Sequence, residues 1–303
     1  MSLGSIIKQI RIQKGITQAE ASSNVITQSN YSKFELGKID ITATALFKIL
    51  NNLDIGFEEF IMLYENEYSN DLNEIINNFF KMGSNRKEHL LQIRKLSKDY
   101  LDKTNIDNQT LQHIIELTYA LEAISDHQDY EKAKFYANPI WKKLQKRDRW
   151  YLREITLLNT ILYIFPFETV KEITKRSLYF LDKYPQIASI QILKVNLLIN
   201  ISLICIKKEN YKLATSYLTQ SLNITNLIPI EFYKVLVEMR LAYCKASIDE
   251  EYIVNIKSSI MYFYSTNNTE MLNHLKKEAQ QYCKNPHFIE TIELYEKKIQ
   301  SIL

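Results

Sequence analysis

Residues 17–38 read TQAEASSNVITQSNYSKFELGK and hold the helix starts and stops that decide the fold of the N-terminal part. Thr17 and Glu20 have the Thr-x-x-Glu spacing of a capping box, which predicts a short helix directly after Thr17. Thr27 can cap the next helix, which Gly37 would end because glycine accepts the left-handed conformation found after helices. The pattern of short helix, tight turn and short helix predicts a helix-turn-helix.

Periodic apolar residues on both sides of this stretch predict three more helices. Ile6, Ile7 and Ile10 share one helical face, and the helix that carries them should stop at Gly15. We therefore expect a compact five-helix domain over residues 1–66. Its last four helices are expected at 18–23, 28–36, 43–52 and 57–66.

Glycine and proline are scarce and unevenly distributed along the chain. The five glycines and five prolines make up about 3% of 303 residues, against roughly 12% in average usage. All glycines lie in the first 83 residues and all prolines after residue 138. This excludes folds that need glycine beside a pyrophosphate and β folds that need frequent turns. We expect an all-α protein, with no positive-φ turns after Gly83.

The composition is that of an ordinary globular chain, with 46% apolar and 24% charged residues and a net charge of +3. The most apolar stretch, 187–206, is interrupted by polar residues, which favours a buried helix over a membrane span. With no signal-peptide core at the start, we expect a cytoplasmic protein. Enzyme motifs, metal-ligand spacings and cofactor motifs are missing, so we expect no catalysis, metal or cofactor. The three cysteines are expected in the core, with redox sensing as an alternative: Cys205, Cys244 and Cys283.

Residues 67–303 carry the periodicity of twelve further helices with short connections, which predicts antiparallel neighbours. Residues 157–164 align with 198–205 at a shift of 41, and 208–214 has a tetratricopeptide-like turn that 127–133 repeats. We expect a right-handed tetratricopeptide-like helical repeat array, in which Pro139 kinks or ends its helix. The expected helices are 68–81, 86–103, 107–125, 130–146, 150–164, 167–181, 187–208, 211–225, 231–247, 251–264, 269–283 and 287–301.

The N-terminal motifs carry a family resemblance. Residues 11–20 and 27–38 resemble the helix-turn-helix of phage repressors. More narrowly, TQSNYSKFELGK with 46–50 and 58–60 resembles the Rgg/GadR/MutR peptide-responsive regulators. The resemblance implies a DNA-binding transcriptional regulator that responds to a short signalling peptide in quorum sensing.

The resemblance also implies which side chains contact DNA. Gln28 and Ser29 would read base edges, with Lys33 one turn further along the same face. Arg11 and Glu35 resemble the internal salt bridge of phage repressors and are expected to be structural. The alternative for the polar residues is a solvated helix face. The implied DNA-binding residues are Gln18, Gln28, Ser29, Asn30, Ser32, Lys33 and Lys38.

The charge balance of the first 66 residues bears on assembly. They carry six basic and seven acidic side chains. Because phosphate neutralisation supplies much of the affinity for DNA, one such domain should bind weakly. We therefore expect a homodimer on an inverted repeat in promoter DNA, with half-sites about one helical turn apart.

Asparagines on the expected inner helices indicate a peptide-binding face. Asn196 and Asn200 stand one turn apart, and Asn159 is the equivalent of Asn200 one repeat earlier. An amide offers both a donor and an acceptor, which suits an extended peptide backbone. The alternative is a merely polar inner surface. The expected peptide-binding set is Arg153, Asn159, Asn196, Asn200, Tyr233, Glu238 and Arg240.

Two other classes of function fit parts of the sequence. The repeats could form a protein-interaction scaffold, with the helix-turn-helix as a packing module. They could also belong to a peptide-regulated, phosphatase-like protein, although such proteins lack the N-terminal motif. Neither alternative accounts for the residues at 17–38 as directly as DNA binding does.

Overall fold

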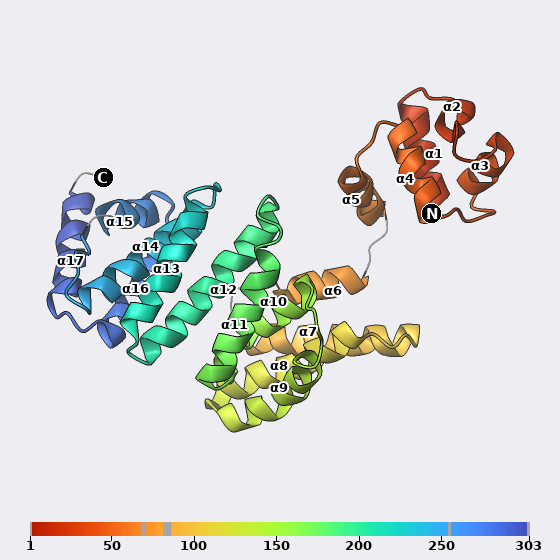
Figure 1. Cartoon of the computed structure of the whole chain (residues 1–303). Coiled ribbons are helices and arrows are strands. Elements are labelled where there is room, and N and C mark those ends of the chain that lie inside the picture. Colours follow the sequence, from red (N-terminus) through yellow and green to blue (C-terminus); the bar gives the residue numbers. More distant parts are fainter. Residues whose placement is uncertain (1, 68–70, 81–85, 254–255, 302–303) are drawn as a thin grey trace. The chain divides into compact units, whose positions relative to one another are not determined.

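The structure is a computed structural model, which describes residues 2–67, 71–80, 86–253 and 256–301 (Figure 1). Within these ranges the regular elements are helices, as expected for an all-α protein. The chain divides into two compact units, residues 1–81 with 96–107 and residues 82–95 with 108–303, and each is described by itself.

The first unit begins with the five expected helices. The first four have N-termini capped by hydroxyl side chains: Ser2, Thr17, Thr27 and Thr42 each accept a hydrogen bond from a backbone N–H in the first turn. Thr17 and Glu20 form the complete capping box. The helices are α1 Leu3–Gln13, α2 Gln18–Ser22, α3 Gln28–Glu35, α4 Ala43–Asn52 and α5 Phe57–Glu67.

A single apolar core joins these helices. Ile7, Ala21, Tyr31, Ile49 and Leu53 are fully buried in it, one or more from each of α1 to α4 and the turn after α4. The pattern confirms the helical face that the sequence predicts for α1. Because α2 and α3 contribute only small or few core side chains, their position depends on the helices around them.

The backbone conformation favours glycine at two positions in this unit. Gly15 and Gly37 follow helices with φ of +68° and +69°, so both act as the expected stops. Gly4 has another role: an added Cβ would lie only 1.8 Å from the carbonyl oxygen of Phe34. The first turn of α1 can therefore lie against the end of α3 only because residue 4 lacks a side chain.

The remaining helices follow the sequence expectation closely (Figure 1). Residues 150–164, expected as one helix, form α10 and a separate 3₁₀ turn at Leu162–Ile164. The helix expected from residue 251 is described only from Ile256. The helices are α6 Asp71–Phe80, α7 Lys87–Thr104, α8 Gln109–His127, α9 Tyr130–Leu144, α10 Leu152–Thr160, α11 Phe167–Leu181, α12 Ala188–Lys207, α13 Tyr211–Thr225, α14 Glu231–Ala246, α15 Ile256–Ser265, α16 Thr269–Tyr282 and α17 His287–Gln300.

The second unit has the layered packing of a helical repeat. Helices α10, α12, α14 and α16 contact one another in succession, while α11 and α13 pack against α12 and α13 also packs against α14. Among the described helices, α12 alone is long and apolar enough to match a membrane span, and 56% of its most apolar window is buried. Its side chains fill the space between its neighbours, as expected of a buried helix.

Two features of the backbone differ from expectation. Of the two alternatives for Pro139, an end of the helix is wrong, because α9 continues through this residue; a kink stays a prediction. Positive-φ turns do occur after Gly83, at non-glycine residues. The short side chains of Asn and Asp tolerate this conformation best, and Gln and Glu adopt it here as well. The residues concerned are Asn105, Gln128, Glu209, Asp249 and Asn267.

Candidate nucleic-acid interface and candidate ligand face

A buried ion pair fixes α1 to the end of α3. Arg11 Nε donates to Glu35 Oε1 at 2.6 Å and Arg11 Nη2 to Glu35 Oε2 at 3.1 Å, a two-pronged contact. The side chain of Glu35 is only 1% exposed. Arg11 also donates to the carbonyl oxygen of Ile16 at 2.8 Å, which ties the α1–α2 turn to the same pair. This geometry gives Arg11 and Glu35 the structural role that the resemblance implies.

Gln18, at the start of α2, joins this network. Its Nε2 donates to Glu35 Oε2 at 2.8 Å, and its side chain is half-buried. Burial opposes the ionisation of Glu35, but hydrogen bonds from Arg11 and Gln18 outweigh it and lower the pKa of the carboxyl. Glu35 is thus held as a carboxylate that positions both α2 and α3. Contact of Gln18 with DNA stays a prediction.

The opposite side of α3 faces solvent. Tyr31, Phe34 and Glu35 point into the core, whereas the first turn is exposed and begins at the Thr27 cap. Such a surface offers amide, hydroxyl and ammonium groups to a ligand. The exposed residues of the implied DNA-binding set are Gln28, Ser29, Asn30, Lys33 and, after Gly37, Lys38; Ser32 is half-buried.

One positioning residue of this domain was missed by the sequence reasoning. Asn52, at the end of α4, donates through Nδ2 to the carbonyl oxygens of Ala21 and Ser23, both at 3.0 Å. It thereby fixes the end of α2 and the turn that leads to α3. No local pattern marks this residue, because its partners lie about thirty residues earlier in the chain.

In the second unit, two of the expected asparagines meet across neighbouring inner helices. Asn200 Nδ2 on α12 donates to Asn159 Oδ1 on α10 at 3.0 Å. Within the described residues, the Asn159 amide hydrogens and the Asn200 carbonyl oxygen have no partner. The pair therefore presents an open donor and an open acceptor side by side. Asn196 stands one turn earlier on α12 and is half-buried.

The other residues of the expected peptide-binding set are dispersed. Arg153, near the start of α10, is exposed, and Tyr233 on α14 is half-buried. Glu238 instead accepts a hydrogen bond from Ser259 of α15 at 3.2 Å, and burial raises the pKa of its carboxyl. A role for Glu238 in peptide binding stays a prediction.

Arg240 requires a correction. Its guanidinium is paired at both ends with Glu278 of α16, Nε to Oε1 and Nη2 to Oε2 at 2.7 Å each, and both side chains are nearly buried. Tyr243 adds its hydroxyl to the same carboxylate. Burial opposes both charges, but Arg240 and Tyr243 lower the pKa of Glu278. A guanidinium so enclosed packs α14 on α16 and is not open to a peptide.

Both parts of the chain match models of known protein families. A model described as "HTH-type transcriptional regulator Rgg, C-terminal domain" matches residues 92–249, more than half of the chain, and a helix-turn-helix model matches residues 7–60. The chain belongs to the Rgg family of HTH-type transcriptional regulators. Its implied DNA-contacting residues and its asparagine pair fall within the two matched regions.

Solved structures share the fold of this Rgg-family chain. A transcriptional regulator from Listeria monocytogenes EGD-e has a TM-score of 0.73 at 18% identity, covering 92% of this chain and 97% of that one. The Streptococcus dysgalactiae SHP pheromone receptor Rgg2 has a TM-score of 0.68 at 16% identity, covering 92% and 99%. Bacillus thuringiensis PlcR, in complex with the peptide PapR7 and DNA, has a TM-score of 0.58 at 17% identity, covering 98% of each chain.

Among the described residues of the regulator, no group of three or more His, Cys, Asp or Glu side chains is placed to hold a metal ion. Cys205 and Cys244 are buried and Cys283 is half-buried. Burial raises the pKa of the Cys205 thiol to about 11. A buried thiol with a raised pKa is a poor nucleophile, which fits the packing role expected of these residues.

Proposed function

We propose that this Rgg-family regulator binds an inverted repeat in promoter DNA as a homodimer, reading base edges with the exposed first turn of α3. We further propose that its repeat array binds a short signalling peptide, so that the chain acts in quorum sensing in the cytoplasm and has no catalytic activity. The functional division would fall at residues 1–66 for DNA binding and 67–303 for peptide binding and dimerisation.

The single observation that carries the DNA proposal is the two-sided character of α3. Its inner side is locked by Tyr31, Phe34 and the ion pair of Glu35, so its outer side is held rigidly. Gln28 and Lys33 on that outer side suit adenine and guanine edges. Ser32 and Lys38 suit phosphates, which position the helix without reading sequence.

The peptide proposal rests on the asparagine pair of α10 and α12. A peptide group presents one donor and one acceptor, and the open groups of Asn159 and Asn200 match both. Asn196, one turn away, could hold the next peptide group. PlcR, which shares this fold, was solved with a peptide and DNA, and Rgg2 is described as a pheromone receptor.

A peptide can change DNA binding only if it prefers one arrangement of the protein over another. In our proposal the peptide bridges α10 and α12 and favours one packing of the inner helices. The dimer would then present its two α3 helices at a different spacing. Both activation and repression are compatible with this scheme.

The DNA proposal is tested by fluorescence anisotropy with the duplex upstream of the gene, using the full-length protein over a series of salt concentrations. We expect affinity to fall steeply with salt and Gln28→Ala/Ser29→Ala to weaken binding by about tenfold or more. The control is Asn51→Ala, which removes an exposed amide in the last turn of α4. Salt-insensitive or undetectable binding would instead favour the scaffold alternative.

The peptide proposal is tested by calorimetry with the synthetic peptide encoded by a short open reading frame beside the gene. Asn159→Ala and Asn200→Ala should each weaken binding by about fivefold to tenfold, because each removes a hydrogen-bonding group; Asn159 is buried and Asn200 half-buried. The control is Asn223→Ala on the neighbouring helix α13. Unchanged affinity in both inner-helix variants would contradict the proposed placement.

A further inference from the structure

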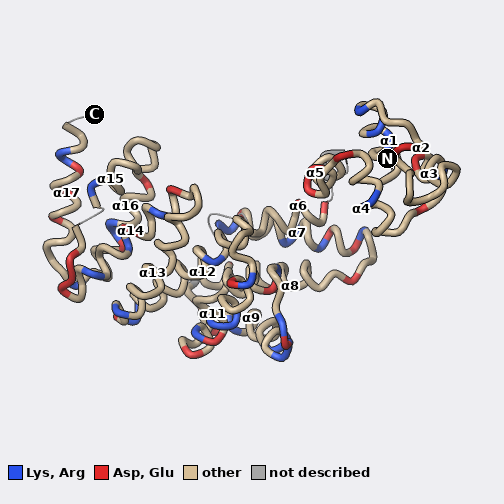
Figure 2. The backbone as a smooth tube through the Cα atoms, turned by 45° about the horizontal axis from the view of Figure 1, so that its top comes forward, with Lys and Arg blue, Asp and Glu red and all other residues tan. Residues whose placement is uncertain are grey.

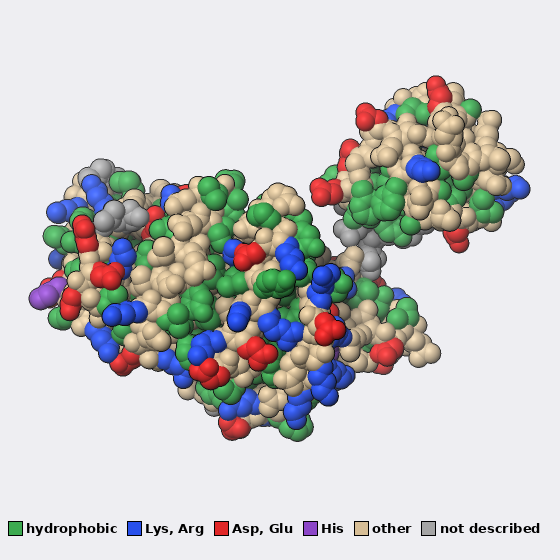
Figure 3. All heavy atoms as spheres, viewed as in Figure 1, with side chains coloured by type: hydrophobic (Ala, Val, Ile, Leu, Met, Phe, Trp, Pro, Cys, Tyr) green, Lys and Arg blue, Asp and Glu red, His purple; other side chains and the backbone are tan. Residues whose placement is uncertain are grey.

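The basic residues of this chain are concentrated in one segment. Residues 130–184, from α9 to just past α11, hold twelve Lys and Arg against six Asp and Glu. The whole chain has a surplus of only three, so the rest of the protein is slightly acidic. Figure 2 marks Lys and Arg positions along α9 and α11, and Figure 3 shows Lys and Arg side chains gathered on the corresponding part of the surface. A local surplus of this size attracts anions.

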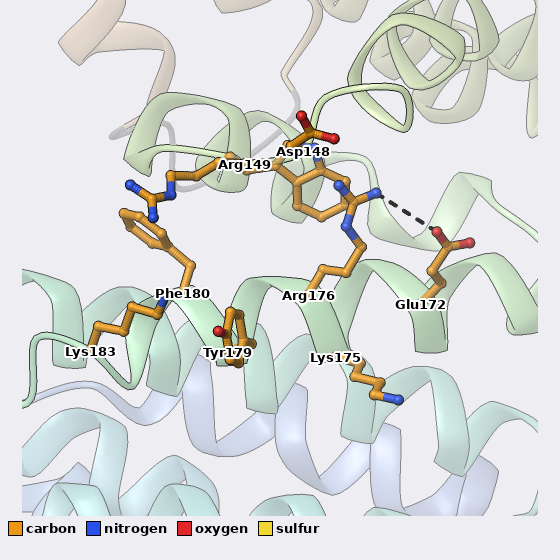
Figure 4. Close-up of a pocket in the computed structure, with 9 residues that line it drawn as sticks. Asp148, Arg149, Glu172, Lys175, Arg176, Tyr179, Phe180 and Lys183 are labelled. Carbon is orange, nitrogen blue, oxygen red and sulfur yellow. Dashed lines mark ion pairs between the residues drawn. The ribbon is translucent and has the colours of Figure 1, made fainter.

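Within this basic segment lies a pocket of about 610 Å³, formed by α11 and the connection between α9 and α10 (Figure 4). Its volume is in the range of small-molecule sites. No residue of α12 or α14 lines it, so it is separate from the asparagine pair. Arg149 reaches from the connection toward Phe180 on α11, and Lys175, Tyr179 and Lys183 follow along α11.

One of the pocket's cations is already used by the fold. Arg176 donates to the carbonyl oxygens of Gln145 and Arg147 at 3.2 and 2.6 Å, and so closes the end of α9. Its guanidinium also lies over the Trp150 ring, 3.9 Å from the centroid. Glu172 lies 3.8 Å from the same guanidinium. These contacts make a fixed floor and satisfy Arg176 and Glu172 within the protein.

The other cations are available to a ligand. Neither Arg149 nor Lys175 forms an ion pair within the described part of the chain, and Lys183 lies only against the Tyr179 ring, 4.4 Å from its centroid. Asp148 is the remaining acidic residue of the lining, which leaves a net positive pocket. Tyr179 itself is 70% exposed, so its ring is accessible to a ligand.

The combination of unpaired cations and accessible rings selects one kind of ligand. A phosphate would pair with Arg149 and Lys183, which lie at the same end of the pocket in Figure 4, since guanidinium and ammonium groups both bind phosphate oxygens. A flat heterocycle would stack on Tyr179, because stacking on aromatic side chains holds bases without reading their sequence. We propose that this pocket binds a nucleotide, with its base against the α11 rings and its phosphate between the cations.

The proposal is tested by calorimetry on the full-length protein with AMP, adenosine and inorganic phosphate as separate probes. AMP should bind at least about tenfold more tightly than either fragment, because only AMP uses both halves of the pocket. Trp150 lines the pocket and gives a second readout by fluorescence. A single-stranded oligodeoxyadenylate of about eight nucleotides separates the two sources of this chemistry, a free nucleotide and a nucleic-acid strand.

The variants remove each half of the pocket without touching the core. Arg149→Gln/Lys183→Gln should weaken AMP binding by about tenfold or more, and Tyr179→Ala by about tenfold. The matched control, Lys212→Gln/Lys257→Gln, removes two exposed cations elsewhere in the array and should leave binding unchanged. Thermal unfolding of each variant shows whether it remains folded.

Three results would overturn the proposal. One is the lack of saturable AMP binding up to about 10 mM. Another is an equal loss of AMP affinity in the pocket variants and in the control, which would show a general charge effect. The third is tighter binding of a short oligoglutamate than of AMP, which would assign the pocket to an acidic protein segment. None of these results bears on DNA reading by α3.

Discussion

Gly4 offers a direct test of how α1 supports the DNA-reading helix. In Gly4→Ala the new Cβ would stand 1.8 Å from the carbonyl oxygen of Phe34, whereas ordinary contacts begin at 3.4 Å. The helices must therefore separate by about 1.6 Å. A clash of this size falls at the upper end of the usual cost of overpacking, about 3 kcal/mol, and better helix propensity returns about 1 kcal/mol. We expect a net loss of about 2 kcal/mol in the local stability of α1 and α3.

Two other glycines provide matched controls. Gly15→Ala meets no atom within 4 Å but keeps a φ of +68°, so it should cost only about 1 kcal/mol. Gly56→Ala meets neither obstacle and should change little. Hydrogen exchange of peptides from α1 and α3 measures the effect locally, and exchange in Gly4→Ala should be about 30-fold faster. Equal protection in Gly4→Ala and Gly56→Ala would refute the close approach of α1 to α3.

Three further predictions concern buried charges. Arg11→Ala leaves Glu35 buried without its ionic partner and should destabilise α1–α3 by about 3–5 kcal/mol. Gln18→Ala removes one hydrogen bond to Glu35 and should cost only about 1–2 kcal/mol. Hydrogen exchange measures both effects, and equal effects would contradict the proposed network. The pKa of Glu278 is lowered in the folded state, so its contribution to the free energy of unfolding is present above its ordinary pKa of 4.5 and is lost as the pH falls. Glu278→Gln should lower the urea midpoint at neutral pH and reduce the loss of stability at acidic pH. Burial, with Lys143 and Arg147 nearby, lowers the pKa of His113 below 6.5, so folding favours the neutral ring and stability should decline as the pH falls below 6.5. His113→Gln should remove that decline. An unchanged pH profile of stability in this variant would contradict the role of His113.

The helices of this protein could be predicted well from sequence because their signals are local. Hydroxyl caps at Thr17 and Thr27, and glycine stops at Gly15 and Gly37, act within one turn of the helix ends they mark. The ends that lack such signals were predicted less well. The break after α10 is one of these, because no glycine or proline marks Thr160 or Ile161.

The assumption that turns with positive φ require glycine failed for a physical reason. Gln128 and Glu209 adopt this conformation at helix ends, where hydrogen bonds from their own N–H groups to the preceding helix offset the steric cost. Packing of the next helix then holds the turn. The positions of glycines do not reveal this compensation, because any residue except proline can donate such a backbone hydrogen bond.

Some features of the candidate sites could likewise be predicted from the sequence, and others could not. The exposed turn of α3 was predictable because a capped helix fixes which side chains share a face. The meeting of Asn159 and Asn200 was suggested by the shift of 41 residues between two repeats. The partner of Arg240 was not predicted, because Glu278 lies two helices later and only the packing of α14 on α16 brings them together.

The central claim is that the first turn of α3 reads DNA sequence. It is tested most directly by selecting duplexes from a random library with the full-length protein and with Gln28→Ala/Ser29→Ala, then sequencing the bound DNA. The wild-type protein should enrich an inverted repeat, and the variant should lose preference at symmetric positions of each half-site. An identical enriched sequence for both proteins would contradict the assignment of α3 as the reading helix.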